Sequence, residues 1–369
     1  MSALPLRRKV AYAAAATALA LGLVGAAAEV GLRVVYEDVS RITGVAEWSA
    51  GEWEGLTYHW DAYHPRLGWT NRPGYESDAR VPFRVTINAQ GLRGPRDHPA
   101  EPPPNRVRVA LFGDSCAFGE EVHDAQTVAA YLERRLRGAE VLNFGVHGYG
   151  LGQMVLRLEE EGFSFSPDHV VVLLLVPGDL DRDVRAEYVH PKPVFGVDAD
   201  GRLEISNVPV PEASRQPWIV RRSFVAAWLF GRPRTVREVE RLGEVLRVTH
   251  ALFDRLERAC DERDVSLTVV PIVTAGPLDR MKADDGEETR ELLSVIRSSL
   301  GSRDGLDVLD LVPSLERWYA EHGSTLVAPH RHWTGPGNCL IADAIGAHLA
   351  ALRPEGLSVR TGARPCVGD

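Results

Sequence analysis

The feature that most constrains this chain is an alternation of strand-like and helix-like segments between Val107 and Leu352. One run, His169–Val176, is apolar almost throughout, as expected of a strand that is buried on both faces. Strands that alternate with helices form a parallel, doubly wound sheet, because each helix returns the chain across a face of the sheet. The expected strands are Val107–Phe112, Glu140–Phe144, His169–Val176, Val265–Val273 and Leu306–Leu311, and the expected helices are Thr127–Arg137, Leu151–Glu161, Val236–Arg263, Glu287–Leu300 and Gly337–Leu352.

The N-terminus carries a second strong signal. The basic residues Arg7–Lys9 precede the uncharged stretch Val10–Ala28, which Glu29 ends. At 1.5 Å per residue this stretch is long enough to cross a bilayer, and the basic flank predicts a cytoplasmic N-terminus with the rest of the chain outside. Two alternatives remain, a signal peptide cleaved near Ala26–Ala28 and a buried alanine-rich helix.

These patterns divide the chain into an anchor or signal peptide (1–30), a β-rich preamble with its linker (31–104), a main domain (105–353) and a tail (354–369). An insertion at 185–235 interrupts the alternation and is expected to shape a substrate site. The aromatic residues of the preamble fit either a carbohydrate-binding face or the preamble's own core. They include Trp53, Tyr58, Trp60, Tyr63, Trp69 and Tyr75.

Composition narrows the function. The 42 Lys and Arg residues against 51 Asp and Glu give a net charge of −9, and no basic stripe indicates a nucleic-acid partner. The four cysteines match no zinc-binding spacing, and Cys116 is expected to be a small buried residue. The glycines in 145–150 lack the order of a dinucleotide-binding loop, so no cofactor is expected.

A candidate nucleophile, Ser115, follows the expected strand Val107–Phe112 in the tripeptide Gly-Asp-Ser. Open α/β sheets bind ligands at the carboxyl ends of their strands, and a serine there needs a base. The most favourable base is His332, in the loop before the last helix. Backbone amides of Ser115 and Gly145 are candidates for an oxyanion hole. A metal site from His330 and His332, with His147 or Asp179 nearby, has no supporting spacing.

Four segments carry a resemblance to a known family. In order, they read GDSCAFGEEV, VLNFGVHGYG, PDHVVVLLLVPGDL and HRHWTGPGNCLIADAI. Together they resemble the GDSL/SGNH hydrolases, a flavodoxin-like superfamily of esterases and lipases with a three-layer parallel sheet. The preamble motifs "LGW…RPG" and "N-x-x-GLRG" make the chain similar to a membrane-anchored bacterial branch. The resemblance covers roughly Tyr63 to Leu352.

The resemblance implies that Ser115 is the nucleophile, His332 the base and Gly145 an oxyanion donor. At two positions this sequence departs from the family pattern. Gly178 occupies the place of the family's third oxyanion donor, an Asn, and His330 occupies the place of the acid that completes the triad. Asp114 and His330 are therefore only possible supporting residues. A Ser–His dyad, or recruitment of Asp307 or Asp310, remains open.

The sequence is compatible with three functions. The first is a serine carboxylester hydrolase outside the cytoplasmic membrane, acting on O-acyl groups of carbohydrates. The second is an O-acetyltransferase that uses the same residues. The third is a degenerate family member that binds a glycan without turnover.

Overall fold

The structure is a computed structural model of the whole chain. The residues that it describes are 5–36, 52–53, 56–57, 60–77, 81–188, 190–212, 219, 222–231, 238–282, 286–303, 305–328, 332–353, 355–362 and 365–366.

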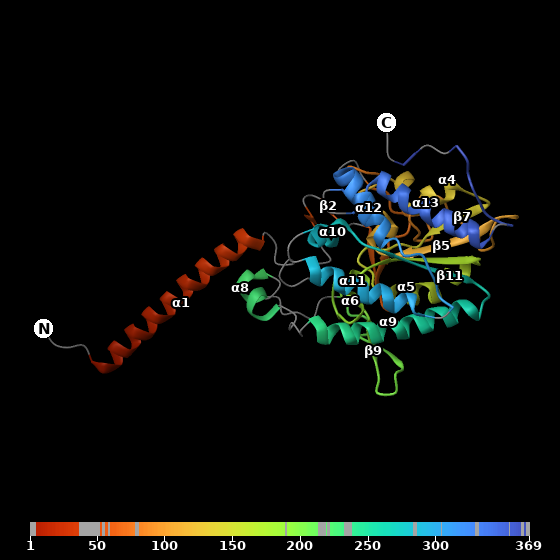
Figure 1. Cartoon of the computed structure of the whole chain (residues 1–369). Coiled ribbons are helices and arrows are strands. Elements are labelled where there is room, and N and C mark those ends of the chain that lie inside the picture. Colours follow the sequence, from red (N-terminus) through yellow and green to blue (C-terminus); the bar gives the residue numbers. More distant parts are fainter. Residues whose placement is uncertain are drawn as a thin grey trace.

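A five-stranded parallel sheet lies at the centre of the main domain (Figure 1). Across the sheet the strands lie in the order β12-β11-β8-β5-β7. Numbered along the chain, that is the 2-1-3-4-5 order of flavodoxin-like folds. The expected fold class is therefore confirmed. The strands are β5 (Val107–Gly113), β7 (Ala139–Asn143), β8 (His169–Leu175), β11 (Ser266–Ile272) and β12 (Asp307–Val308).

Helices cover both faces of the sheet and complete the three layers (Figure 1). Helices α4, α12 and α13 lie on one face, and α5 and α9 lie on the other. The main helices are α4 (Val128–Arg135), α5 (Leu151–Glu160), α6 (Gly178–Asp183), α9 (Glu238–Asp261), α10 (Ala275–Lys282), α11 (Gly286–Gly301), α12 (Val312–His322) and α13 (Gly335–Leu352).

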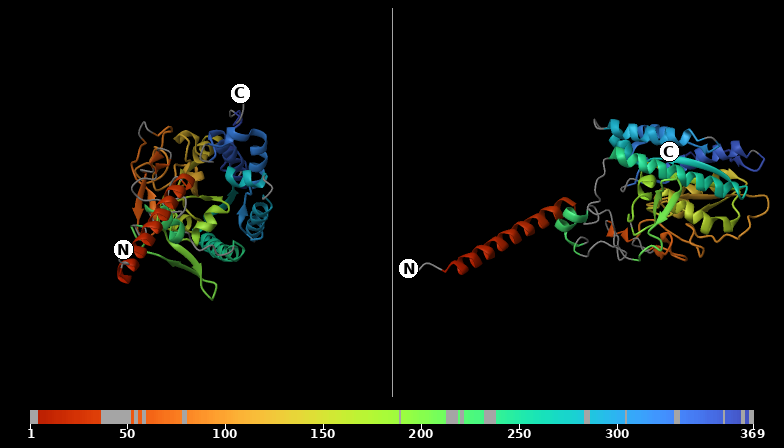
Figure 2. Two further views of the ribbon diagram at one scale, coloured as in Figure 1. Left: turned by 90° about the vertical axis from the view of Figure 1, so that its left-hand side faces the viewer. Right: turned by 90° about the horizontal axis from the view of Figure 1, so that it is seen from below.

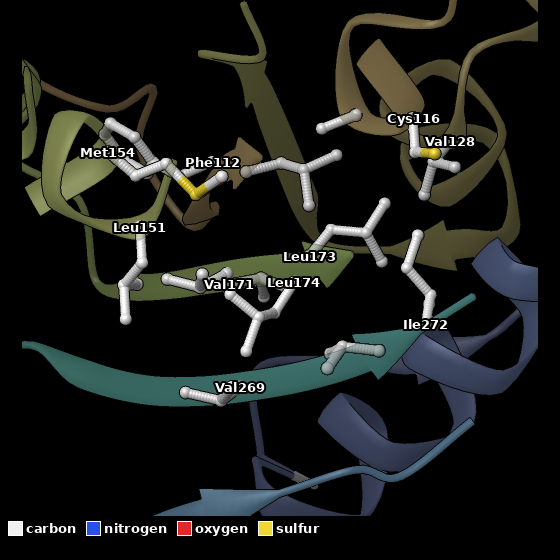
Figure 3. Close-up of a cluster of buried hydrophobic side chains, with 14 of the residues drawn as sticks. Phe112, Cys116, Val128, Leu151, Met154, Val171, Leu173, Leu174, Val269 and Ile272 are labelled. Carbon is white, nitrogen blue, oxygen red and sulfur yellow. The ribbon is translucent and has the colours of Figure 1, made fainter. Parts of the chain in front are cut away.

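The core forms where side chains of the sheet meet the helices (Figure 3). Val171 and Leu173 on the central strand β8 are fully buried, and Phe112 on β5 is 1% exposed. Burying one such side chain contributes about 1.5–3 kcal/mol, so the sheet is stabilised mainly by its apolar strands.

Most element boundaries fall within a few residues of the expected ones, but the end of the domain differs. Of the expected strand Leu306–Leu311, only Asp307 and Val308 pair as strand residues. Helix α12 begins directly afterwards at Val312 and was not predicted. The insertion contains an unpredicted hairpin of β9 (Val194–Val197) and β10 (Leu203–Ser206).

The preamble packs into the main domain through its aromatic residues. Trp60 and Trp69 are 1% and 0% exposed, and the Trp69 indole donates to the His147 carbonyl at 3.0 Å. For these two residues a carbohydrate-binding face is therefore wrong, because no ring surface is available for stacking. Trp53 and Tyr58 have side chains outside the described part. The preamble strands are β1 (Glu52–Trp53), β2 (Leu56–Thr57), β3 (Asp61–His64) and β4 (Gly68–Asn71).

Helix α1 (Leu6–Tyr36) projects from the body of the protein in Figure 1 and in the right-hand view of Figure 2. Its segment Arg7–Val35 is long and apolar enough to cross a membrane, with a mean hydropathy of 1.8, although a signal sequence has the same properties. Near the end of α1, Glu29 accepts hydrogen bonds from the Ser223 hydroxyl and from the first amide of α8 (Phe224–Ala226).

A disulfide joins Cys339 on α13 to Cys366 in the C-terminal tail. The same tail forms β13 (Ser358–Val359), which pairs with β6 (Leu136–Arg137) after α4. The tail is therefore held on the α4–α13 face by a covalent bond and by a strand pair. Cys116 is buried, as expected.

Candidate active site

Ser115 lies where the central sheet ends and a short helix begins. Strand β5 ends at Gly113, and Ser115 is the first residue of α3 (Ser115–Phe118). The Asp114 side chain caps this helix by accepting the Cys116 amide at 2.9 Å. Gly119 ends it with a φ of 82°, a conformation that favours glycine. The turn holds Ser115 at the carboxyl edge of the sheet with 8% of its surface exposed.

The buried Arg182 stabilises this turn through its contact with Asp114. The Arg182 guanidinium donates to Asp114 Oδ2 at 3.0 Å, to Asp179 Oδ1 at 2.7 Å and to the Tyr149 carbonyl at 2.8 Å. Burial raises the pKa of Asp179, and the carboxylate of Asp114 raises it further, whereas Arg182 opposes that rise. Arg182 is thus the counter-charge for two buried acids, one of which shapes the serine turn.

Gly145 packs directly against the serine helix. A Cβ built on Gly145 would lie 2.2 Å from the Phe118 nitrogen, so only glycine fits. Its amide donates to Asn143 Oδ1 at 2.9 Å in this structure. On the same loop Gly148 has a φ of 71°, and its amide donates to no acceptor in the described part of the chain. Gly148 is a second candidate oxyanion donor, which the sequence analysis did not select.

Replacing Gly145 with alanine is expected to lower the free energy of unfolding by about 3 kcal/mol, because the added methyl overlaps the backbone of α3. Urea denaturation measures the change. Gly196→Ala is the matched control, since a Cβ there meets nothing within 4 Å. Equal stability of the two variants would show that α3 and the Gly145 loop are not in close contact.

His332 lies in the loop before α13 and reaches the segment after α3. Residues Val327 and Trp333 pair across the loop, and the buried Trp333 indole donates to the Val273 carbonyl at 3.0 Å beyond β11. These contacts place His332 between two acids. Its Nδ1 lies 2.9 Å from Glu121 Oε2, and its Nε2 lies 3.2 Å from Glu120 Oε2.

Ser115 and His332 come to the same edge of the sheet. The Ser115 carbonyl accepts the Glu120 amide at 3.1 Å, so the acids that contact His332 begin one turn after the serine. Within the described residues, however, Ser115 Oγ donates to Asp114 Oδ2 at 3.3 Å and not to His332. In enzymes without substrate the serine–histidine hydrogen bond is often long or poorly aligned.

A buried chain of charges continues from His332 into the preamble. Glu120 Oε1 lies 3.3 Å from His147 Nδ1, and His147 Nε2 lies 2.8 Å from Asp61 Oδ2. Asp61 also contacts His190 at 2.8 Å. Burial raises the pKa of Glu120, although His332 and His147 oppose the rise. The preamble therefore supplies a buried anion, Asp61, which is linked through His147 to Glu120 of the candidate site.

The other predicted residues are placed as follows. Gly178 is the first residue of α6, and His330 lies outside the described residues. Asp307 contacts His348 at 2.8 Å, and Asp310 contacts Arg297 at 2.5 Å. Since both acids are engaged elsewhere, neither supports His332. Glu120 and Glu121 do contact it, and sequence reasoning missed them.

One surface cavity of about 640 Å³ lies beside α4. Arg93, Arg96 and Arg106 line it, but neither Ser115 nor His332 does. The cavity is therefore separate from the serine turn.

The placement of the quoted motifs decides the fold type. GDS follows the first strand of the sheet, NFG the second and PGD the third, while the HRHW segment precedes the last helix. Combined with the 2-1-3-4-5 sheet, this is the arrangement that the resemblance implies. The chain has a flavodoxin-like fold.

Comparison with models of known families and with curated proteins finds no match. Among solved structures, an acetyl xylan esterase is similar at 14% identity and a TM-score of 0.38, over 66% of this chain and 100% of that one. A lipase/acylhydrolase from Enterococcus faecalis is similar at 16% identity and a TM-score of 0.38, over 69% of this chain and 100% of that one. A GDSL-like lipase from Bacteroides thetaiotaomicron is similar at 12% identity and a TM-score of 0.37, over 68% of this chain and 91% of that one.

Proposed function

We propose that this chain is a serine-dependent carboxylester hydrolase. The observation that carries the proposal is the meeting of two segments at one edge of the sheet. Ser115 starts the short helix after β5, and His332 contacts the two acids that directly follow that helix. A serine and a histidine that contacts the acids one helical turn after that serine are the kinds of group that acyl transfer requires.

In the proposed reaction, Ser115 Oγ attacks the carbonyl carbon of an ester while His332 Nε2 takes the hydroxyl proton. The carbonyl oxygen becomes an oxyanion, for which amides of Ser115 and of the Gly145–Gly148 loop are the candidate donors. Collapse of the intermediate breaks the ester bond, and the leaving alcohol takes the proton from His332. Water then attacks the acyl-enzyme, releases the carboxylic acid and restores Ser115.

We further propose that the reaction takes place outside the cytoplasmic membrane. The basic residues Arg7–Lys9 before the apolar stretch of α1 favour a cytoplasmic N-terminus with the main domain on the other side. The Cys339–Cys366 disulfide supports the same placement, because disulfides persist mainly in oxidising compartments. O-acyl groups of extracellular carbohydrate are the proposed substrate.

Release of acetate from acetylated xylan and from 4-nitrophenyl acetate by the full-length chain in detergent tests this proposal. Hydrolysis of either ester that the Ser115→Ala variant lacks is the expected result. Equal rates for the two proteins would refute a serine mechanism. Product analysis with an added sugar acceptor separates hydrolysis from acyl transfer.

Gly178→Asn is expected to raise kcat/KM by about 10- to 100-fold, because it restores a side-chain donor at the position of the family's third oxyanion group. Gly178 does not have a positive φ, and the atoms nearest to an added Cβ lie 3.4 Å away, so the backbone can accept a side chain. Initial rates and the melting temperature check this. A stable variant with unchanged kcat/KM would show that residue 178 does not face the oxyanion.

A further inference from the structure

We propose that Glu121 is the positioning acid of the site, and that it replaces the acid that is missing two residues before His332. This inference rests on the proposed hydrolase function and specifies how its base is oriented. It is carried by the contact between Glu121 and His332, by the backbone conformation of Glu121 and by the burial of its carboxylate.

The contact involves the appropriate nitrogen. Glu121 Oε2 lies 2.9 Å from Nδ1 of His332, and only 8% of the Glu121 side chain and 13% of the His332 side chain are exposed. In a serine–histidine–acid arrangement the acid binds Nδ1, which fixes the ring and directs Nε2 toward the nucleophile. A nearly buried carboxylate also requires a charged or hydrogen-bonding partner, and the imidazole meets that need.

The backbone of Glu121 is unusual for its residue type. Its φ is 62°, in the left-handed region that favours glycine. The other non-glycine residues with positive φ in the described part are Asn105, Ser166, Asn207 and Asp264, all with short polar side chains. Residues held in this conformation concentrate at functional sites. Here the conformation directs a long acidic side chain back toward His332.

Glu120 does not meet the same requirements. It lies 3.2 Å from Nε2 of His332, on the side of the ring that has to face the serine. It also contacts His147, which links it to Asp61. Glu120 therefore belongs to the buried chain of charges that runs to His147 and Asp61, whereas Glu121 is the acid that contacts Nδ1 of His332.

The charges around His332 set its response to pH. Burial lowers the pKa of His332, but Glu120, Glu121 and Asp114 together raise it above its ordinary value. The base works only when neutral, so activity falls as the pH drops through this raised pKa. Removing the Glu121 charge lowers the pKa and moves the acid limb of the kcat/KM profile to lower pH.

The test compares the full-length wild type with Glu121→Gly and Glu121→Gln. Glycine removes the carboxylate and suits the positive φ. A purely structural role for the Glu121 carboxylate predicts a melting temperature below that of the wild type, with kcat and the acid limb of the folded protein unchanged. The proposal predicts a melting temperature close to that of the wild type but a kcat lower by about 10²- to 10⁴-fold, with KM within about twofold. The acid limb should move to lower pH in both variants.

Rescue provides a second readout. In Glu121→Gly/His330→Asp, an acid returns to the position that the family resemblance implies, and kcat is expected to recover at least about tenfold. An active wild type with unchanged kcat and acid limb in Glu121→Gly and Glu121→Gln would overturn the role of Glu121 alone. A folded wild type without any hydrolysis would overturn the proposed function and this inference together, so the two failures are distinguishable.

Discussion

Ser115→Ala is expected to abolish ester hydrolysis by the full-length chain, with kcat lower by at least about 10³-fold. The variant loses the nucleophile, and its neighbour Cys116 cannot replace it. Cys116 is 3% exposed, and burial raises the pKa of its thiol well above the usual range, so almost no thiolate is available. Acetate release from 4-nitrophenyl acetate measures the loss.

Stability should not change in this variant, because among the described residues Ser115 Oγ makes one hydrogen bond, a 3.3 Å contact with Asp114. Ser164→Ala is the matched control, an exposed serine whose hydroxyl donates to a backbone carbonyl. Activity close to wild type in a folded Ser115→Ala protein would rule out the serine mechanism and return the search to the other titratable groups of the site.

The second large effect is on folding. Arg182→Met is expected to lower the free energy of unfolding by about 3–5 kcal/mol, because removal of one partner leaves buried charges uncompensated. Asp114 and Asp179 are both 0% exposed, and both depend on the Arg182 guanidinium. Urea denaturation followed by tryptophan fluorescence provides the measurement.

A surface ion pair serves as the control. Arg202 and Asp200 lie 3.3 Å apart with side chains 79% and 72% exposed, so Arg202→Ala should change stability by less than about 0.5 kcal/mol. If Arg182→Met were equally mild, the two acids would be neutral in the folded protein, and Arg182 would not be their counter-charge. Since Asp114 also caps α3, a destabilised but folded Arg182→Met should hydrolyse esters more slowly.

The sheet was predictable because its signal is local. The run His169–Val176 is apolar at every position after His169, and the helices between the strands have clear amphipathic patterns. The end of the domain was not predictable in the same way. Only two residues of the expected last strand form strand pairs, and α12 begins soon afterwards at Val312. The mixed pattern of Leu306–Leu311, which contains two Asp residues, does not show where strand pairing stops.

The candidate site was predictable only in part. Gly-Asp-Ser and His332 were found because each lies beside a strand or helix whose position the pattern predicts. Glu121 was missed because its contact with His332 joins residues 211 positions apart. The resemblance places the acid two residues before His332, whereas in the structure the acid on His332 Nδ1 comes from the segment after α3. The buried Asp61–His147 contact likewise depends on how the preamble packs.

The most direct test of the account is covalent labelling of the full-length chain in detergent with a fluorophosphonate probe, read by peptide mass spectrometry. The probe reports an activated serine without knowledge of the substrate. The proposed serine mechanism predicts a label on Ser115 that disappears in His332→Ala. A folded chain that takes no label at Ser115 would contradict it and favour a glycan-binding protein that has lost its catalytic activity.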